Sequence, residues 1–141
     1  MRNVLFVDDD TAVLSGLRRM LHPMRAQWEM TFVADASSAL AAMEVQPADV
    51  VVTDMRMPGF DGARLLAQIR TRWPQTVRVV LSGFADEGAA LRSVPVAHQF
   101  LSKPCDPQVL TATIRGACDL RDRLARPELR ELVGGLGSLP S

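Results

Sequence analysis

Three aspartates, Asp8, Asp9 and Asp10, directly follow an apolar run near the start of the chain, in the stretch LFVDDDTAVL. Carboxylates this close repel one another, by about 4 kcal/mol for a pair about 4 Å apart at an effective dielectric constant near 20. Either protons or a cation must offset that repulsion. Oxygen ligands with open positions suit Mg²⁺, which keeps several waters and accepts phosphate oxygens as further ligands.

Three other side chains that can do chemistry also follow apolar runs: Asp54, Ser82 and Lys103. A carboxylate beside a divalent cation, an ammonium group and a hydroxyl is equipped to attack phosphorus and to hold the resulting acyl phosphate. Asp54 is the candidate nucleophile. Lys103 is expected to pair with a carboxylate at rest and with a phosphoryl oxygen after the reaction. Taken singly, Asp54 fits a helix cap or turn, and Lys103 fits a solvated charge. The predicted phosphoryl-accepting site therefore depends on the convergence of these residues.

The elements that must position these residues follow from the apolar pattern. Runs rich in Val, Leu and Phe alternate with stretches of helical period, which is typical of βα units around a parallel sheet. We expect strands at residues 4–7, 30–34, 50–53, 77–81 and 98–102, and helices at 11–21, 38–45, 62–72, 87–92 and 107–124. This predicts an α/β fold, a doubly wound (βα)5 sandwich with a five-stranded parallel sheet. Because such sheets place their sites beyond the carboxyl ends of the strands, we expect one rim to gather Asp8, Asp9, Asp54, Ser82 and Lys103.

Local signals mark the helix ends and one helix face. Ser37 or Ser38 is expected to cap the second helix, and Asp106 followed by Pro107 to start the last one. In that last helix, apolar residues recur every three or four positions, so one stripe is expected in the core: Leu110, Ile114, Ala117, Leu120 and Leu124.

Composition narrows the class of protein. The 141 residues, 48% hydrophobic and 23% charged, suit a compact domain. Sixteen basic and sixteen acidic residues cancel, which argues against a nucleic acid partner held through its phosphates. No apolar run has the length of a membrane span or forms a secretory signal, so we expect no membrane contact and a cytoplasmic location. Cys105 and Cys118 are expected as buried or half-buried thiols, and His22 and His98 as structural or surface residues.

The order and spacing of four segments resemble those in the receiver domains of two-component response regulators. The segments are FVDDD, VVVTDMRMPGFDG, VVLSGFA and FLSKP. The resemblance covers about residues 1–124. It implies the flavodoxin-like strand order 2-1-3-4-5, and it leaves residues 125–141 as a short helix and linker tail with the output domain absent. It also implies a regulatory domain that takes a phosphoryl group from a histidine kinase or phosphotransfer protein, with only self-phosphorylation and self-dephosphorylation chemistry of its own.

The resemblance assigns roles to the acids. Asp54 corresponds to the phosphorylated aspartate, and Asp8 and Asp9 to the acidic pair that holds Mg²⁺. The implied metal contacts are Asp9, Asp54 and the backbone carbonyl of Arg56, while Asp8 acts mainly through metal-bound water. Asp10 is expected outside the site.

The resemblance also implies a switch. Ser82 corresponds to the hydroxyl that moves toward the phosphoryl group, and Phe100 to the aromatic residue that then turns inward, which remodels the face formed by the fourth helix, fifth strand and fifth helix. Lys103 matches the family's lysine, and a cis peptide before Pro104 is implied to aim it inward. An inert core role for Phe100 is the alternative.

Arg56 and Phe84 match the variable positions that flank the path of the hydrolytic water. Both side chains are bulky, so we expect slow loss of the phosphate.

The tail, ARPELRELVGGLGSLPS, begins with a proline break and ends in linker composition. It and HQFLSKPCD resemble receivers joined to HDOD-type or HD-GYP-type output domains. The chain is then either an excised receiver or a single-domain regulator that acts on a downstream protein. A homodimer through the face of the fourth helix, fifth strand and fifth helix, here called the switch face, is one further option. Another is packing on a second copy through apolar residues of the tail: Leu129, Leu132, Val133 and Leu136.

Two other functions compete with the phospho-accepting switch. A haloacid-dehalogenase-like phosphohydrolase also uses a strand-end aspartate, Mg²⁺ and a lysine, and Asp8 and Asp10 fit its Asp-x-Asp run. However, Ala12 stands where that family has Thr or Val, and Asp54 would be unexplained. The third reading is a receiver fold that is never phosphorylated and serves only as an interaction module. Loss of an acid or of the lysine would favour it, and none is missing.

Overall fold

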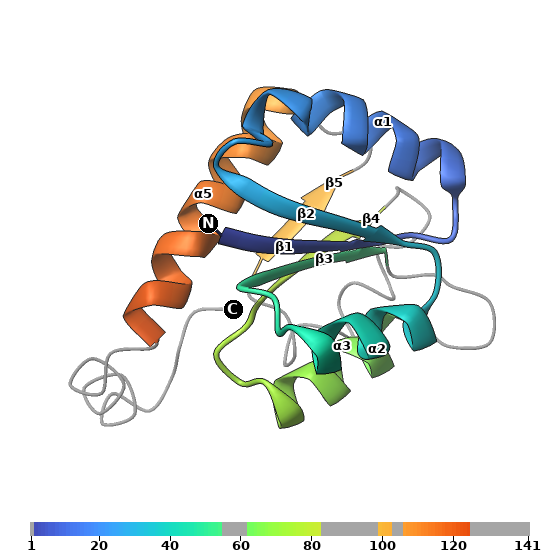
Figure 1. Cartoon of the computed structure of the whole chain (residues 1–141), viewed down its shortest axis with the longest axis vertical. Coiled ribbons are helices and arrows are strands. Elements are labelled where there is room, and N and C mark those ends of the chain that lie inside the picture. The colour runs from blue at the N-terminus through green and yellow to red at the C-terminus, as the bar shows by residue number, and fades with distance from the viewer. Residues whose placement is uncertain (1, 55–61, 83–98, 103–105, 125–141) are drawn as a thin grey trace.

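The structure is a computed structural model that describes residues 2–54, 62–82, 99–102 and 106–124 (Figure 1). A five-stranded sheet has the order β2-β1-β3-β4-β5, and each neighbouring pair is parallel. Its strands are β1 (Arg2–Val7), β2 (Trp28–Val33), β3 (Val50–Asp54), β4 (Val77–Ser82) and β5 (Gln99–Ser102). The order confirms the predicted flavodoxin-like sheet.

Helices cover both faces of this sheet. α1 and α5 lie on one face, and α2 and α3 on the other (Figure 1). The helices are α1 (Thr11–Leu21), the short 3-10 helix η1 (His22–Met24), α2 (Ala36–Val45), α3 (Gly62–Arg72) and α5 (Pro107–Leu124). The predicted helix at 87–92 falls outside the described residues. Within the described ranges, no helix is both long and apolar enough to cross a bilayer.

The core is split by the sheet into two apolar clusters. On the α1 and α5 side, Phe6 stacks on Phe32 with ring centroids 4.8 Å apart, and Leu110 and Ile114 of α5 are fully buried. On the other side, the sheet packs against fully buried residues of α2 and α3: Ala39, Met43, Leu65, Leu66 and Ile69. The predicted apolar stripe of the last helix is confirmed where it is described.

All five residues of β3 are buried, as a central parallel strand requires. The strand at the sheet's edge was placed less well by the sequence. β2 begins at Trp28 and ends at Val33, and not at 30 and 34 as predicted. The reason is its register, since Arg2 of β1 pairs with Trp28 and extends both strands beyond the apolar run.

Asp35, and not Ser37 or Ser38, caps α2. Its Oδ1 accepts a hydrogen bond from the N–H of Ser38 at 2.7 Å, so the helix begins at Ala36, two residues before the predicted start. That hydrogen bond to the charged form lowers the pKa of Asp35. The expected start of α5 is confirmed, because Asp106 Oδ1 accepts from the N–H two residues on at 2.7 Å.

Candidate functional site

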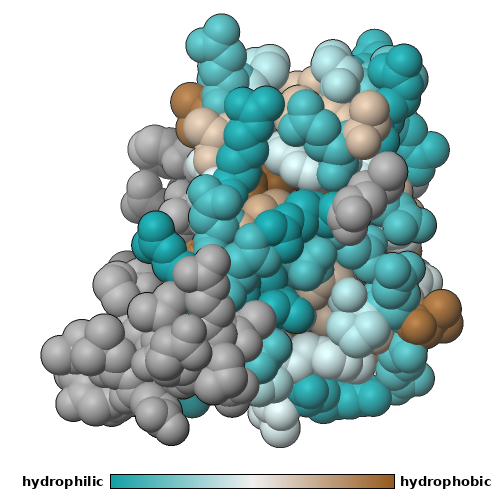
Figure 2. All heavy atoms as spheres, turned by 60° about the vertical axis from the view of Figure 1, so that its left-hand side comes forward, coloured by the Kyte–Doolittle hydropathy of each residue, from teal (hydrophilic) through white to brown (hydrophobic). Residues whose placement is uncertain are grey.

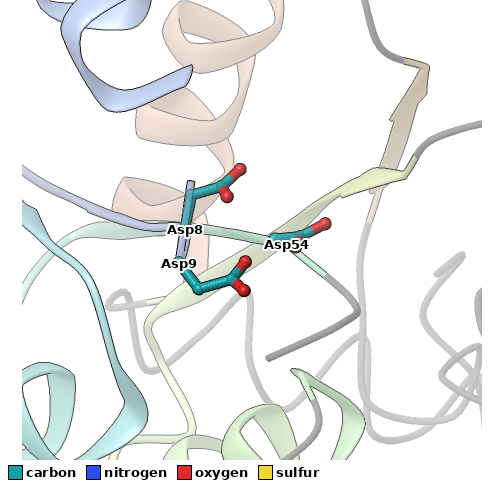
Figure 3. Close-up of side chains that lie close together, drawn as sticks. All are labelled: Asp8, Asp9 and Asp54. Atoms are coloured by element: carbon teal, nitrogen blue, oxygen red, sulfur yellow. The ribbon is translucent and has the colours of Figure 1, made fainter. Parts of the chain in front are cut away.

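Three carboxylates meet at the carboxyl edge of the sheet, those of Asp8, Asp9 and Asp54. β1 and β3 run parallel with Val7 opposite Thr53, so the next residue of each chain segment reaches the same edge. Each acid offers a carboxylate oxygen, and these oxygens all lie within 4.8 Å of one another. Figure 3 shows the three side chains directed to the same side of this edge. The structure thus brings together the three acids that the sequence placed at one rim.

The backbone gives the neighbouring aspartates different positions. The N–H of Asp8 donates to the carbonyl of Val33 in β2 at 3.1 Å, and Asp8 Oδ1 accepts from the N–H of Asp10 at 2.9 Å. Asp10 serves another purpose, because its Oδ1 accepts from the N–H groups of Ala12 and Val13 at 2.9 and 3.4 Å. Asp10 therefore caps α1 and stands apart from the three-carboxylate cluster.

The cluster has a buried side and an open side. Asp8 is 1% exposed and Asp54 is 5% exposed, whereas Asp9 is exposed. Thr53 holds the backbone at Asp54, since its Oγ1 donates a hydrogen bond to the Asp54 carbonyl at 3.0 Å. A ligand approaching from solvent would therefore meet Asp9 first and reach Asp54 at the end of the buried strand.

The donor set fits a hard divalent cation. All three groups are carboxylates, which are the ligands that Mg²⁺ takes, and an open side leaves room for the waters and phosphate oxygens that complete its coordination. The mutual repulsion of carboxylates at this spacing also favours a bound cation. Asp8, Asp9 and Asp54 therefore match a Mg²⁺ site in type and in arrangement.

The remaining predicted site residues are placed only in part. Ser82 ends β4, whose Leu81 lies opposite Asp54, and Phe100 lies in β5 opposite Val80. Both are thus on strands that continue the sheet away from the acids, although their side chains are outside the described part. The other predicted residues fall outside the described residues altogether: Arg56, Phe84, Lys103 and Pro104.

The opposite edge of the sheet holds acids of another kind. Asp122, in the last turn of α5, forms an ion pair and two hydrogen bonds with Arg2 at the start of β1. Asp49 lies 3.7 Å from Arg121 Nε and accepts a hydrogen bond from the N–H of Asn3 at 2.9 Å. Sequence reasoning missed these pairs, because Arg2 and Asp122 are 120 positions apart and no local pattern links them.

The predicted thiol and histidine environments are confirmed where the structure describes them. Cys118 of α5 is 4% exposed, and burial raises the pKa of its thiol to about 11. His22 is exposed. Cys105 and His98 fall outside the described residues.

The sequence profile of the response regulator receiver domain matches residues 4–115. Among curated proteins, the hydrogenase transcriptional regulatory protein HoxA of Cupriavidus necator is 35% identical over 91% of this chain and 29% of its own length. The DNA-binding transcriptional regulator NtrC of Salmonella typhimurium is 31% identical over 93% of this chain and 28% of its own length. The chain thus spans less than a third of these relatives.

Solved structures agree with the profile. A receiver domain of an HD domain-containing protein from Pseudomonas fluorescens superposes with a TM-score of 0.80 at 29% identity, covering 86% of this chain and 97% of that one. A response regulator receiver domain protein from Clostridium thermocellum gives 0.78 at 26% identity, covering 88% and 99%. The profile, the relatives, the sheet order and the acidic rim agree, and the chain belongs to the response regulator receiver domain family, the regulatory phospho-acceptor domains of two-component signalling.

Proposed function

We propose that Asp54 accepts a phosphoryl group from a histidine kinase or a phosphotransfer protein in a Mg²⁺-dependent reaction. The observation that supports this most strongly is the three-carboxylate cluster, whose oxygens lie within 4.8 Å of one another at the open end of β3. Asp54 ends a fully buried strand, so its carboxylate is held at a fixed place. A fixed nucleophile reduces the entropy that the transfer must lose.

In the proposed step, a carboxylate oxygen of Asp54 forms a bond to phosphorus while the bond from phosphorus to the donor's imidazole nitrogen breaks. Asp8 and Asp9, with Asp54 and the backbone carbonyl of Arg56, would hold the cation. When bound, Mg²⁺ supplies positive charge to the phosphoryl oxygens as they approach an acidic site. Asp8 is positioned for this by its bonds to the Asp10 and Val33 backbone.

Lys103 is assigned the role of pairing with the phosphoryl oxygens after transfer. β5 ends at Ser102, and Lys103 is the next residue in the sequence. We assign to Ser82 and Phe100 the coupled movement that carries the signal to the face of the fourth helix, β5 and α5. A cis peptide before Pro104 would orient Lys103 toward the acids.

The reaction is tested by incubating the protein with Mg²⁺ and a small acyl-phosphate donor and measuring its intact mass. We expect a gain of one phosphoryl group in the wild type and none in Asp54→Asn. Asp49→Asn is the matched control, because it makes the same substitution at the other edge of the sheet, and it should still gain the group. Sustained turnover of donor would favour the phosphohydrolase reading, and no adduct in the wild type would favour the interaction module.

The bulk of Arg56 and Phe84 is proposed to slow the loss of the phosphate by obstructing the attacking water. The double variant Arg56→Ala/Phe84→Ala should lose its phosphoryl group faster than the wild type, followed by intact mass after removal of the donor. An unchanged lifetime would contradict this assignment.

Residues 1–124 are proposed as the receiver, with 125–141 as a connection to an output domain or to a downstream protein. Two curated relatives are named as transcriptional regulators, and one solved neighbour comes from an HD domain-containing protein. These names support either a transcriptional output or an HD-domain output. For an HD-domain output, the more specific proposal is an HDOD-type or HD-GYP-type domain. We further propose a cytoplasmic location, where kinase domains meet their receivers. We also propose a homodimer through the switch face or the tail.

A further inference from the structure

A second feature, far from the acids, is an open groove of about 860 Å³ beside β2. One wall comes from α1 and η1 and the segment after it, and the other from β2. Five consecutive residues of β2 line it, Trp28 to Phe32. Consecutive residues of a strand point to opposite faces of the sheet, so a groove lined by all of them runs along the strand's edge and not over one face.

The edge of β2 is a pairing surface. In the sheet that the structure describes, β2 is a terminal strand and pairs with β1 alone. A terminal strand presents backbone N–H and C=O groups on its outer side, and these groups are a template for one more strand. Met30 and Phe32 are only partly buried and pack against the core cluster, so an added strand would also cover apolar surface.

The wall across from this edge is basic. The Arg18 guanidinium lies 4.7 Å above the Phe32 ring, and Arg25 is held by a hydrogen bond from Nη1 to the His22 carbonyl at 3.0 Å. That bond uses one of the five N–H donors of a guanidinium. Glu29 is the one carboxylate among the lining residues, so the two permanent cations, Arg18 and Arg25, outweigh it.

Figure 2 shows the molecule from a side on which hydrophilic residues cover most of the described surface and apolar atoms show in a recess between them. A groove with an apolar floor, basic walls and an unpaired strand edge selects for an extended segment whose apolar and acidic residues alternate. Main-chain bonds would supply affinity and side chains specificity, as in strand addition elsewhere.

We propose that this groove is a docking site for an extended acidic segment of a partner protein, which adds to the sheet beside β2 and places its carboxylates against Arg18 and Arg25. A second copy of this chain is a poorer occupant, because a two-fold contact through the groove would bring the same basic walls together. The proposal is independent of phosphorylation at Asp54.

The probe is a fluorescein-labelled peptide of about eight residues, a usual strand length, in which glutamate alternates with valine. Binding is measured by fluorescence anisotropy at low salt, and hydrogen exchange of residues 28–33 reports whether β2 gains protection. Two control peptides carry lysine in place of glutamate, or N-methyl groups on alternate amides that block strand pairing.

The variant Arg18→Glu/Arg25→Glu should weaken peptide binding at least about tenfold, or about 1.4 kcal/mol. Arg70→Glu/Arg72→Glu is the matched control, because it makes the same change in net charge on α3, across the sheet, and it should change affinity less than about twofold, an effect within the usual range for a distant surface site. Arg18→Gln/Arg25→Gln provides a milder variant if the first does not fold, as judged by circular dichroism. All folded variants should still take up phosphate.

Binding that requires the arginines and free peptide amides, with protection of residues 28–33, supports the proposal. Three results would overturn it: no binding of the acidic peptide, equal binding of the lysine or N-methylated peptide, or self-association in sedimentation that the Arg18→Glu/Arg25→Glu variant abolishes.

Discussion

The two edges of the sheet use aspartates in opposite ways. At the carboxyl edge, Asp8, Asp9 and Asp54 bring their oxygens within 4.8 Å of one another. At the amino edge, Asp122 and Asp49 face the guanidinium groups of Arg2 and Arg121. The nearby ends of α2 and α3 are joined in the same way, with Glu44 Oε1 2.9 Å from Arg72 Nη2.

Acids that face a guanidinium group and acids that face one another have different roles, the first in stability and the second in function. An acid that faces a guanidinium lowers the energy of the folded chain by itself, although a half-exposed pair contributes little. Acids that face one another do not, and such clusters are typical of sites where a ligand or a reaction uses the concentrated charge. Composition alone cannot distinguish the two, because the same residue type serves at both edges.

Folding is expected to restrict the reaction of Cys118, near the amino edge of the sheet, with water-borne reagents. Burial, opposed by the charge of Arg2 and reinforced by Asp49, Asp119 and Asp122, raises the pKa of Cys118 from 9.0 to about 11. Because only the thiolate reacts, alkylation of Cys118 at pH 8 should be about a hundredfold slower in the folded protein than in urea. Peptide mapping by mass spectrometry after iodoacetamide treatment measures the rate at this residue alone.

The sign of the pH effect follows from the same shift. Between pH 9.0 and about 11 the folded state holds a proton that the unfolded state releases, so the free energy of unfolding falls as the pH rises through this window. Equal alkylation rates in the folded and unfolded protein would show that the amino edge is open to solvent.

The same substitution should have opposite effects at the two edges. Without divalent cations, Asp9→Asn removes repulsion and should raise the free energy of unfolding by about 1 kcal/mol. Asp49→Asn removes a charge that faces Arg121 and accepts from Asn3, and should lower it by about 1 kcal/mol. Urea unfolding followed by circular dichroism measures both.

Two further results bear on this pair of variants. Adding Mg²⁺ should stabilise the wild type and Asp49→Asn more than Asp9→Asn, because the stabilisation by a ligand grows with its affinity for the folded state. If both substitutions lower stability by the same amount, the contrast between the edges has no energetic basis.

The smallest effect is expected for the ion pair between Arg2 and Asp122, whose side chains are 39% and 38% exposed. A double-mutant cycle with Arg2→Ala and Asp122→Ala should give a coupling below about 1 kcal/mol. The coupling should shrink further in 1 M salt, where charges are screened within about 3 Å. A coupling of several kcal/mol that salt does not change would mean that the pair is far better shielded than its exposure indicates.

Much of the fold could be predicted because its signals are local. The apolar runs found all five strands, and Asp106 before Pro107 correctly started α5. The position of Asp8 and Asp54 at one rim followed from the rule that parallel strands end at one edge. Where two local signals competed, the sequence misled, as when Asp35 and not a serine capped α2.

Features that depend on distant partners could not be predicted. The start of β2 at Trp28 depends on its register with Arg2. Arg78 looks like an exposed residue in an alternating strand, yet it is 7% exposed, and burial first, then the charge of Arg70, lowers its pKa to about 10. The groove beside β2 combines a helix, a turn and a strand edge, and none of these carries a motif.

Asp8, Asp9 and Asp54 are expected to form one divalent cation site. Isothermal titration calorimetry of Mg²⁺ into the wild type, Asp9→Asn and Asp49→Asn measures the affinity of this site. We predict one Mg²⁺ bound per wild-type chain, an affinity at least about tenfold lower in Asp9→Asn because a carboxylate ligand is lost, and wild-type affinity in Asp49→Asn. Equal affinity in all three proteins, or no binding to the wild type, would show that these three acids do not form a cation site.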